Sequence, residues 1–371
     1  MKNKAKNGKI VPRGMKTILP HGGLPENISP YLINLIQKTG GINGPIGKQF
    51  IAQPTKEKKY AKTKIIDPLI EDKYRKAPGL IYKYRGKIGK NGKIICYGRV
   101  LWTITYFCES YCRFCTRGRE VGVLGQKPLL TEKQINQGFE FLKNHPEINE
   151  VILSGGDPLV IPKQYLKKII HHLVRFQKQG SLDIIRIGTR LPISSPLTIK
   201  TWHYNLLAKI KNPYLMVHIN HPAELTPQAI KVLNNFRQKS QALILSQTVL
   251  LKEVNDSAKI LSELFVKMTK EGIRPYYVFQ NDPVYWAKHF TVPIGKAIKI
   301  WQSLRSKLSG VAATARFVID TPFGFGKIPI PEGEAWKVDY SCFYDFKKKK
   351  HPLSLQRRRL SFTLKKHILG S

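Results

Sequence analysis

The sequence predicts an α/β fold built on a parallel sheet. From about residue 100, short apolar runs rich in β-branched residues alternate with longer helical patterns, as βα units do. Six such runs are present, and six parallel units are too few to close the usual eight-stranded barrel. An open or partial barrel and a doubly wound sheet are both compatible with this pattern. The expected strands are Val100 to Phe107, Glu150 to Ser154, Ile184 to Thr189, Leu215 to Asn220, Leu243 to Thr248 and Tyr276 to Phe279.

Helical segments are expected between these strands. The segment Thr131 to Asn144 opens with Thr131-Glu-Lys-Gln, a capping box that satisfies two backbone amides at the start of a helix. A second helix is expected over Lys163 to Gln179 and ends at Gly180, because glycine readily adopts the left-handed conformation after a helix. The first hundred residues are less regular and contain short helical pieces such as Ser29 to Thr39. We interpret them as an arm or cap.

Residues suited to binding or chemistry follow the predicted strands. The carboxyl ends of parallel strands meet at one edge of a sheet, which is where α/β proteins place their active sites. Five of the six runs are followed by such residues. They are the cysteines after the first run, Gly155-Gly156-Asp157-Pro158 after the second, Arg190 after the third, His221 after the fourth and Asp282 after the sixth.

Composition limits the class of protein. The 371 residues, of which 42% are hydrophobic, suffice for one barrel-sized domain with appendages. No stretch approaches the run of about 20 apolar residues that crosses a bilayer. The basic N-terminus lacks the apolar core of a signal peptide, and its glycines and prolines oppose the amphipathic helix of a transit peptide. We therefore expect a cytoplasmic protein without membrane contact.

The formal net charge of +39 raises the question of a polyanionic partner. Most of the cations are lysines spread along the whole chain, which favours a solvated, lysine-rich surface. The exception is the end of the chain, where Lys347 to Lys350 and Arg357 to Arg359 form two basic blocks. Contact of this tail with RNA is one interpretation, and a disordered tail is the favoured one.

Three of the five cysteines crowd together in Cys108-Glu-Ser-Tyr-Cys112-Arg-Phe-Cys115. An odd number of cysteines with this spacing indicates metal binding rather than disulfides. Three thiols on one loop can converge on an iron–sulfur cluster, and because most clusters take four cysteines, one iron stays open for another ligand. A zinc knuckle or three unrelated buried thiols are the alternatives, and the preceding strand and the aromatic after Cys112 disfavour both.

This motif resembles that of the radical S-adenosylmethionine (SAM) superfamily, and the resemblance covers nearly the whole chain beyond about residue 90. It implies an open, partial (β/α)6 barrel, a [4Fe-4S] cluster held by the three cysteines, and SAM bound to the open iron. Reductive cleavage of SAM then yields a 5′-deoxyadenosyl radical. The segment Gly155-Gly156-Asp157 is similar to the family's glycine-rich segment, whose backbone amides meet the amino acid part of SAM.

Further segments resemble the lysine 2,3-aminomutase family. The resemblance implies that His218 and Gln247 lie near SAM and that Arg117 faces the substrate carboxylate. It also implies that Arg99 binds the phosphate of a second cofactor, pyridoxal 5′-phosphate (PLP). The segments are Tyr111-Cys-Arg-Phe-Cys-Thr-Arg117, Thr189-Arg-Leu-Pro192, His218-Ile-Asn-His-Pro222, Gln247-Thr-Val-Leu-Leu-Lys-Glu-Val-Asn-Asp256 and Arg274-Pro-Tyr-Tyr277.

The PLP prediction depends on Asp320-Thr-Pro-Phe-Gly-Phe-Gly-Lys327. In the aminomutases this segment ends in the lysine that binds PLP covalently, here Lys327. The family has an uninterrupted glycine run where this chain has Phe323 and Phe325, which could alter the pocket. Asp282 and Asp320 match the two aspartates that meet the far ammonium group of lysine in the family, so the resemblance implies L-lysine as the substrate and β-lysine as the product.

Two departures from the family bear on the prediction. Larger members carry a structural zinc, whereas this chain has Ser257 at the first ligand position and only Cys342 near its end, so no zinc is expected. The segment Gly86 to Cys96 resembles an insertion before the first strand, without an assigned function, and Cys96 is expected to be buried. The shorter kind of relative, which supplies β-lysine for elongation factor P, is mildly favoured.

The predicted organisation is an N-terminal arm over residues 1–93, a radical SAM core over 94–310, a PLP-binding segment over 311–340 and a basic tail over 341–371. Flavodoxin or ferredoxin is the expected electron donor, and a homo-oligomer is expected. Alternatives within the superfamily are a glutamate or arginine aminomutase and an RNA-modifying enzyme. An iron–sulfur protein that only transfers electrons or binds RNA is the alternative from another class.

Overall fold

The computed structural model describes residues 24–63, 65–123, 127–322, 326–330, 342–344 and 349–352. Its centre is one ten-stranded sheet. In order across the sheet, the strands are β1 (Arg75–Ala77), β2 (Leu80–Tyr84), β5 (Gly98–Thr105), β6 (Ile148–Gly155), β7 (Ile184–Thr189), β8 (Tyr214–His218), β9 (Leu243–Leu250), β10 (Arg274–Gln280), β11 (Arg316–Asp320) and β12 (Lys327–Pro329). Strands β5 to β11 pair with one another in parallel. Strands β1, β2 and β12 pair antiparallel.

The predicted α/β fold with an open sheet is confirmed. Strands β5 to β10 coincide with the six expected runs, and the sheet does not close, because β1 and β12 form its two edges. The structure adds a seventh parallel strand, β11, which pairs with β10 through Val278 opposite Phe317. Strands β1 and β2 also join this sheet, although the sequence places them in the arm.

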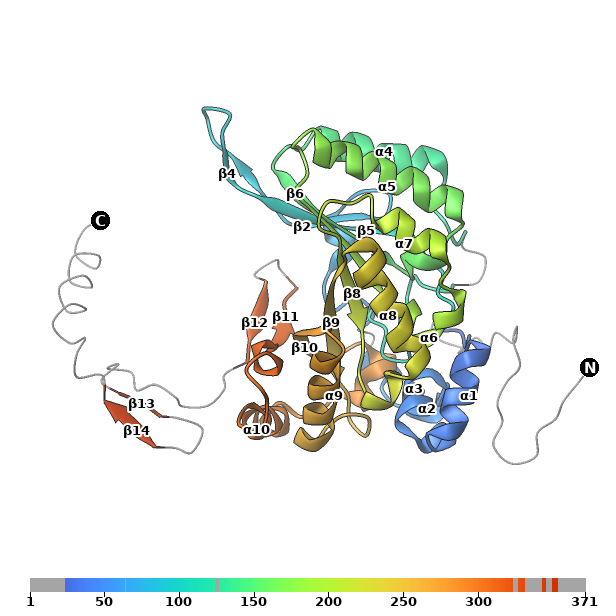
Figure 1. Ribbon diagram of the computed structural model, residues 1–371, viewed down its shortest axis with the longest axis vertical. Helices are drawn as coiled ribbons and strands as arrows, with labels where there is room; N and C mark the ends of the chain where they lie inside the picture. Colours follow the sequence, from blue (N-terminus) through green and yellow to red (C-terminus); the bar gives the residue numbers. More distant parts are fainter. Residues whose placement is uncertain are drawn as a thin grey trace, which may run out of the picture.

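A helix lies between each pair of consecutive parallel strands, and Figure 1 shows these helices beside the sheet. The predicted capping box is present at the first of them, where Thr131 N donates to Gln134 Oε1 at 2.8 Å and Gln134 N donates to Thr131 Oγ1 at 3.3 Å. The next helix ends at Lys178, one residue before the expected end at Gln179, and Gly180 has the positive φ expected after a helix, +75°. The helices are α4 (Glu132–Lys143), α5 (Lys163–Lys178), α7 (Thr201–Leu207), α8 (Pro227–Ser240), α9 (Ala258–Lys270) and α10 (Ile294–Arg305), with α6 (Leu191–Ser194) directly after β7.

The main core fills the space between these helices and the sheet. The large side chains of Trp102 and Trp301 are buried there. Phe139 on α4 packs edge-to-face against Trp102, with ring centroids 5.1 Å apart. Burial of such side chains on both layers fixes the helices to the sheet and so holds the carboxyl ends of the strands in place.

The N-terminal arm packs against the loop that carries the three cysteines. Its helices are α1 (Pro30–Lys38), α2 (Pro45–Phe50) and α3 (Pro54–Lys58). Arg113 in the cysteine loop forms a two-pronged ion pair with Glu57 on α3, at 2.9 Å and 2.5 Å, and both side chains are buried. Breaking such a buried pair is strongly destabilising. The arm therefore stabilises the conformation of the loop.

Side chains bridge the two ends of the open sheet. Lys83 and Tyr84 lie on β2, near one edge, and Asp320 and Thr321 lie at the end of β11, near the other edge. Lys83 Nζ donates to the carbonyl oxygen of Thr321, and Tyr84 Oη donates to Asp320 Oδ1 at 3.4 Å. The two ends of the open sheet are thus joined at this point by side-chain contacts, without a ladder of backbone hydrogen bonds between strands.

The segment Gly86 to Cys96 forms a separate hairpin of β3 (Lys87–Ile88) and β4 (Ile94–Cys96). Figure 1 shows it projecting from the body of the protein. Ile95 is 63% exposed, and Cys96 is exposed too. The expected burial of Cys96 is therefore wrong, because the hairpin stands away from the core.

Near the end of the described chain, β13 (Cys342–Tyr344) pairs with β14 (Lys350–Pro352). Phe323, Phe325 and the basic block at residues 357–359 lie outside the described residues. Among the helices of the described chain, none is long and apolar enough to cross a bilayer.

Candidate active site

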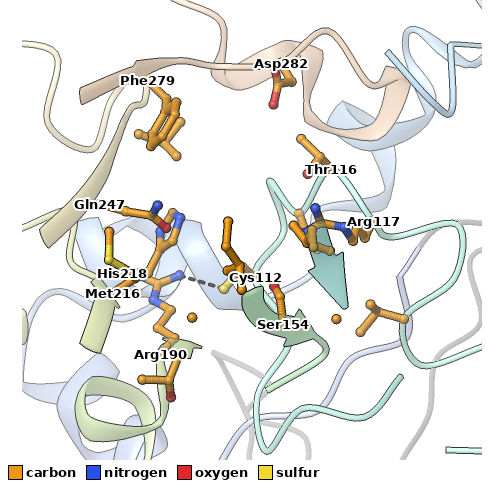
Figure 2. A pocket seen from close by; sticks show the side chains of 18 of the residues that line it. Cys112, Thr116, Arg117, Ser154, Arg190, Met216, His218, Gln247, Phe279 and Asp282 are labelled. Carbon is orange, nitrogen blue, oxygen red and sulfur yellow. Dashed lines mark hydrogen bonds between the residues drawn. The ribbon is translucent and has the colours of Figure 1, made fainter. Parts of the chain in front are cut away.

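One cavity of about 400 Å³ lies at the carboxyl ends of the parallel strands. Figure 2 shows part of its lining, with side chains from several strands pointing toward a common space. Arg190 lines the cavity, whereas His221 does not, and His221 Nδ1 accepts a hydrogen bond from Ala223 N at 3.2 Å instead. Every residue that the family resemblance assigns to the site contributes to the lining. These residues are Arg99, Cys108, Cys112, Cys115, Arg117, Gly155, Gly156, Asp157, His218, Gln247, Asp282, Asp320 and Lys327.

The arm and a loop after β10 hold the backbone of the cysteine loop. Asn27 Nδ2 donates to the carbonyl oxygen of Glu109 at 3.0 Å, and Arg113 N donates to the carbonyl oxygen of Gln49 at 2.8 Å. On the other side, Trp286 Nε1 donates to the carbonyl oxygen of Cys115 at 3.0 Å. These bonds connect the loop to segments far away in the sequence, so the thiols are positioned by the folded protein as a whole.

The three thiols are partly buried in the wall of the cavity. Burial raises the pKa of each, to about 11 for Cys115. Neighbouring thiols add to the rise at Cys108 and Cys115, whereas the Arg190 guanidinium opposes the rise at Cys112. Such thiols need a cation to become thiolates, and iron provides one.

In the part of the chain that the structure describes, no three Cys, His, Asp or Glu side chains are grouped for a single metal ion. A cluster makes a different demand, because each thiolate binds a different iron and the ligands are spread around the cluster. Three free thiols, Cys108, Cys112 and Cys115, on the wall of one cavity fit such a cluster.

The glycine segment after β6 fixes the start of the cysteine loop. Gly156 N donates to the carbonyl oxygen of Thr105 at 2.7 Å, and Asp157 N donates to that of Phe107 at 2.9 Å. A Cβ atom at Gly156 would lie 2.1 Å from the Phe107 carbonyl oxygen, and Gly155 has a φ of +112°. The amides of Gly156 and Asp157 are thus bonded to the protein, although the resemblance implies that amides of this segment meet SAM.

The Asp157 side chain is buried and joins two strand ends. Its Oδ2 accepts the backbone amides of Arg190 and Leu191 at 2.7 and 2.9 Å, and its Oδ1 accepts that of Leu159 at 3.0 Å. Thr189 Oγ1 donates to it at 2.8 Å. Asp157 lines the cavity, but its described hydrogen bonds hold the backbone in place.

His218, at the end of β8, lines the cavity and has a buried ring nitrogen that is unsatisfied. Burial, assisted by the nearby Arg190 cation, lowers the pKa of His218 to about 3, so its ring is neutral at physiological pH. Its Nδ1 is out of contact with water and has no hydrogen-bond partner among the described residues. Gln247 on β9 is its register partner. An unsatisfied buried polar atom is costly, and a ligand in the cavity would satisfy it.

Arg117 follows the cysteine motif and binds a carboxylate from the arm. Its Nε and Nη2 donate to Glu71 Oε2 and Oε1 at 2.9 and 2.6 Å. Burial alone would lower the pKa of Arg117, but the Glu71 carboxylate outweighs this effect and raises it. The two-pronged pair fixes the plane of the guanidinium group.

Lys327 lies in a chain of contacts at the other side of the cavity. Its Nζ is 2.6 Å from Asp320 Oδ2 and 5.1 Å from the centre of the Phe279 ring. Asp320 accepts a hydrogen bond from Tyr84, and the Arg99 guanidinium lies over the Tyr84 ring at 4.0 Å. Arg99 and Lys327 are therefore connected through two intermediate side chains.

Asp282, after β10, has an unusual carboxyl group. Burial and, to a smaller extent, the Asp320 carboxylate raise the pKa of Asp282, the Lys327 ammonium group opposes this rise, and the resulting pKa is about 7. The aspartates and Lys327 thus influence one another electrostatically within the same cavity. A second cation placed near this group would favour the ionised form of Asp282.

Comparison with known proteins identifies the family. Residues 102–259 match the sequence profile of the Radical SAM superfamily. The chain is 34% identical to L-lysine 2,3-aminomutase of Clostridium subterminale over 303 residues, or 82% of this chain and 68% of that protein. It is 35% identical to L-lysine 2,3-aminomutase of Fusobacterium nucleatum over 304 residues, or 82% of this chain and 66% of that protein. The chain belongs to the lysine 2,3-aminomutase family.

This aminomutase-family chain spans about two thirds of the length of those two relatives. Membership makes it an enzyme of the radical SAM aminomutase type, which implies an iron–sulfur cluster and SAM. Among solved structures, a radical SAM methyltransferase from Sphaerobacter thermophilus has a TM-score of 0.44 and 17% identity, over 65% of this chain and 78% of that chain.

Some residues of the aminomutase site were not predicted from the sequence. Glu71 and Lys83 line the cavity, and so does Tyr84. Burial lowers the pKa of Lys83, although the carboxylates of Asp320 and Glu71 oppose this effect. Lys83 and Tyr84 lie on a short strand before the inserted hairpin, and Glu71 lies in a segment without a regular pattern. The sequence therefore has no hydrophobic periodicity there from which these residues could be predicted. Ser257, considered only as a missing zinc ligand, caps α9 by accepting Ile260 N at 3.2 Å.

Proposed function

We propose that this enzyme interconverts L-lysine and β-lysine by migration of an amino group between carbons 2 and 3, with PLP as a second cofactor. The observation that carries the proposal is one cavity that contains Arg117, Asp282, Asp320 and Lys327. The cavity thus combines an amine that can bind PLP, a cation that can bind a carboxylate and two carboxylates that can bind an ammonium group. The two lysine 2,3-aminomutases reported above support the same reaction.

The cluster and SAM would occupy the part of the cavity lined by Cys108, Cys112 and Cys115. Three thiolates leave one iron of a [4Fe-4S] cluster open, and SAM would bind there. Together, the cluster and SAM supply the radical that abstracts hydrogen from the substrate. His218 and Gln247 would contact SAM, with His218 Nδ1 gaining the hydrogen bond that it lacks. Gly155 to Asp157 would shape the cavity around its amino acid part.

Lys327 would bind PLP covalently and Arg99 would bind its phosphate. The contacts from Arg99 through Tyr84 and Asp320 to Lys327 support this assignment, because they place both groups along one wall. The Phe279 ring beside Lys327 gives that wall an apolar surface. When bound, PLP supplies a π-system through which nitrogen can migrate. Charge-assisted bonds such as the one from Arg99 to phosphate are among the stronger polar contacts.

L-Lysine is the substrate that suits the charges of the cavity. Its carboxylate would meet Arg117, and its distal ammonium group would meet Asp282 and Asp320. A buried ammonium group without a carboxylate costs several kcal/mol, so a pocket for lysine needs negative charge at that depth. Glutamate would place a second carboxylate beside Asp282 and Asp320, where like charges repel. Both glutamate and arginine serve as comparison substrates.

The proposal extends to conditions and partners. The cluster must receive one electron from an external carrier. We propose flavodoxin or ferredoxin as this carrier and the cytoplasm as the location. A homo-oligomer and the domain limits at residues 93, 310 and 340 remain predictions. The experiment below distinguishes the proposed reaction from RNA modification and from electron transfer without SAM cleavage.

The experiment uses full-length protein reconstituted anaerobically with iron, sulfide and PLP, then supplied with SAM, dithionite and one amino acid at a time. We expect 5′-deoxyadenosine from SAM and β-lysine from L-lysine, both measured by chromatography and mass spectrometry. SAM cleavage with β-glutamate or β-arginine as the preferred product would replace the substrate assignment. SAM cleavage with no amino acid product would contradict the aminomutase reaction, and no SAM cleavage would contradict the radical chemistry.

Two pairs of variants test the residues. Cys112→Ala should lose the iron and the cluster absorbance, whereas Cys96→Ala, in the exposed hairpin, should keep both. Lys327→Ala should lose β-lysine formation and the visible absorbance of bound PLP, whereas Lys296→Ala, on the surface of α10, should keep them. Retention of the cluster in Cys112→Ala or of full turnover in Lys327→Ala would show that these assignments are wrong.

A further inference from the structure

Arg190 makes a direct contact with one of the three cysteines. Its Nη1 donates to Cys112 Sγ at 2.7 Å, the bond drawn as a dashed line in Figure 2. Arg190 follows β7, and Cys112 lies in the loop after β5, so the fold brings them together over 78 positions of sequence. Arg190 lies in the segment Thr189 to Pro192 that resembles the family, but neither this resemblance nor the cysteine spacing predicts its contact with the sulfur.

The guanidinium group of Arg190 is rigidly held. Nη2 donates to Gln49 Oε1 at 2.6 Å and to Glu224 Oε1 at 2.8 Å. The guanidinium carbon lies 4.4 Å from the centre of the Phe50 ring and 5.2 Å from that of Phe114. Only 8% of Arg190 is exposed. A donor held by two acceptors and two rings cannot easily turn away from the sulfur.

Glu224 pairs with this cation through Nη2, whereas the sulfur is bonded through Nη1. Glu224 is fully buried, and it accepts hydrogen bonds from Gln49 Nε2 and Asn220 N, both at 2.8 Å, in addition to Arg190. The three groups therefore form a chain of contacts from carboxylate to guanidinium to thiol. In a buried environment the field of each charge is weakly screened, so both Arg190 and Glu224 act on the sulfur.

We propose that Arg190 sets the reduction potential of the iron–sulfur cluster by donating a hydrogen bond to the Cys112 thiolate, with Glu224 moderating its charge. This inference rests on the proposed ligation of the cluster by Cys108, Cys112 and Cys115. Reduction adds one electron, and hence one negative charge, to the cluster. A donor and a positive charge at a ligand sulfur stabilise the reduced form and raise the potential, and a nearby carboxylate lowers it.

The experiment measures the midpoint potential of the cluster by redox titration followed with electron paramagnetic resonance, in the reconstituted full-length protein without SAM. Arg190→Gln should shift the potential to more negative values, because both the charge and its bond to sulfur are lost. Glu224→Gln should shift it to less negative values, because the guanidinium charge is no longer offset. Arg190→Lys, which keeps the charge but not the two-armed geometry, should fall between native protein and Arg190→Gln.

Arg186→Gln is the matched control. Arg186 lies on β7 and also lines the cavity, but it pairs with Glu150 and is four residues, or about 13 Å of extended strand, from Arg190. Its loss should leave the potential unchanged. A merely structural role of Arg190 would give Arg190→Gln and Glu224→Gln shifts of the same sign, or none, and either result would overturn the inference.

The iron content separates this inference from the proposed function. A native protein without a cluster contradicts the proposed ligation. If the native protein holds a cluster and neither Arg190→Gln nor Glu224→Gln changes its potential, only the proposed role of Arg190 is contradicted. If Arg190→Gln does not take up iron, Arg190→Lys and Glu224→Gln still decide the sign of the effect, and shifts other than those stated overturn it.

Discussion

Lys327 Nζ and Asp320 Oδ2 lie 2.6 Å apart, on residues that are register partners in the antiparallel pair β11–β12. The strand pair thus brings the proposed PLP lysine and one of the two carboxylates into contact without any cofactor. In the proposed function, Lys327 would hold PLP and Asp320 would meet the distal ammonium group of the substrate. Asp320 would therefore lie between the lysine that holds the cofactor and the distal end of the substrate.

Asp320→Asn and Asp282→Asn should each reduce lysine turnover. The hydrogen bond of a carboxylate to a charged partner contributes about 1.5 to 3 kcal/mol, so kcat/KM for L-lysine should fall about ten- to a hundredfold. Slow cleavage of SAM without substrate should remain within about twofold, since neither carboxylate touches the cysteine loop. Steady-state kinetics measure the first quantity and 5′-deoxyadenosine formation measures the second. Native-like lysine turnover in both variants would show that Asp282 and Asp320 do not bind the distal ammonium group of lysine.

The affinity for L-lysine should depend on pH through Asp282. The pKa of Asp282 is raised to about 7, so below that pH the carboxyl group is neutral and cannot pair with the substrate ammonium group. The KM for lysine should therefore fall as the pH rises from 6 to 8. Asp282→Asn should show a flatter profile over this range. An identical profile in the variant would show that another group titrates.

Asp282 should also make the ligand-free protein less stable as pH rises. A carboxyl group whose pKa is higher in the folded than in the unfolded protein stabilises the fold fully below its unfolded pKa, and this contribution is lost as pH rises through the folded pKa. The relevant window therefore ends near pH 7. Thermal unfolding should show a smaller loss of stability between pH 5 and 8 in Asp282→Asn than in the native protein.

Arg117→Lys should weaken substrate binding, and Arg119→Lys should not. Arg117 lines the cavity and is held by two bonds to Glu71, which orient its planar group. Lysine provides a point charge without this fork, so the KM for L-lysine should rise about tenfold or more, on the scale of one charged hydrogen bond. Arg119 pairs with Asp72 and Asp67 outside the cavity lining, and its variant should have a native KM. Equal effects in the two variants would contradict the assignment of Arg117.

Gly156→Ala should prevent normal cluster loading. The new Cβ would lie 2.1 Å from the Phe107 carbonyl oxygen, one residue before Cys108, so the backbone of the cysteine loop must move. We expect a lower melting temperature and reduced iron content. Gly295→Ala is the control, because nothing lies within 4 Å of its added Cβ and alanine favours the helix α10 by up to about 1 kcal/mol. Full iron content in Gly156→Ala would show that the close approach is not required.

The elements that sequence analysis predicted correctly carry strong local patterns. Strands β5 to β10 each contain an apolar run, and the helix after Thr131 has both members of its capping box in sequence. The cysteines were found because three metal ligands share one loop. The strand-end rule then placed Arg190, His221 and Asp282 at one edge of the sheet before any contact was known.

Long-range contacts were beyond the reach of local patterns. Strand β11 lies within the predicted PLP-binding segment over residues 311–340 and is not predicted as a strand, because five residues with charged ends give little periodicity. Glu71 is recognised as a site residue by its ion pair with Arg117, which lies 46 positions away and leaves no local pattern in the sequence. The burial of Cys96 was expected from the general behaviour of free cysteines, whereas the hairpin that carries it has no layer to pack against. The contact between Arg190 and Cys112 likewise depends on the packing of the arm against two strand ends.

The bridge from Lys83 and Tyr84 to Thr321 and Asp320 gives the barrel a seam. To separate two neighbouring strands elsewhere in the sheet, a ladder of backbone hydrogen bonds must be broken. To separate the two sides of the seam, only two of the contacts that the structure describes must be broken, the hydrogen bond from Lys83 to Thr321 and the long one from Tyr84 to Asp320. Among the contacts that the structure describes, those that hold the wall together are therefore fewest beside Lys327, where PLP would bind in the proposed function.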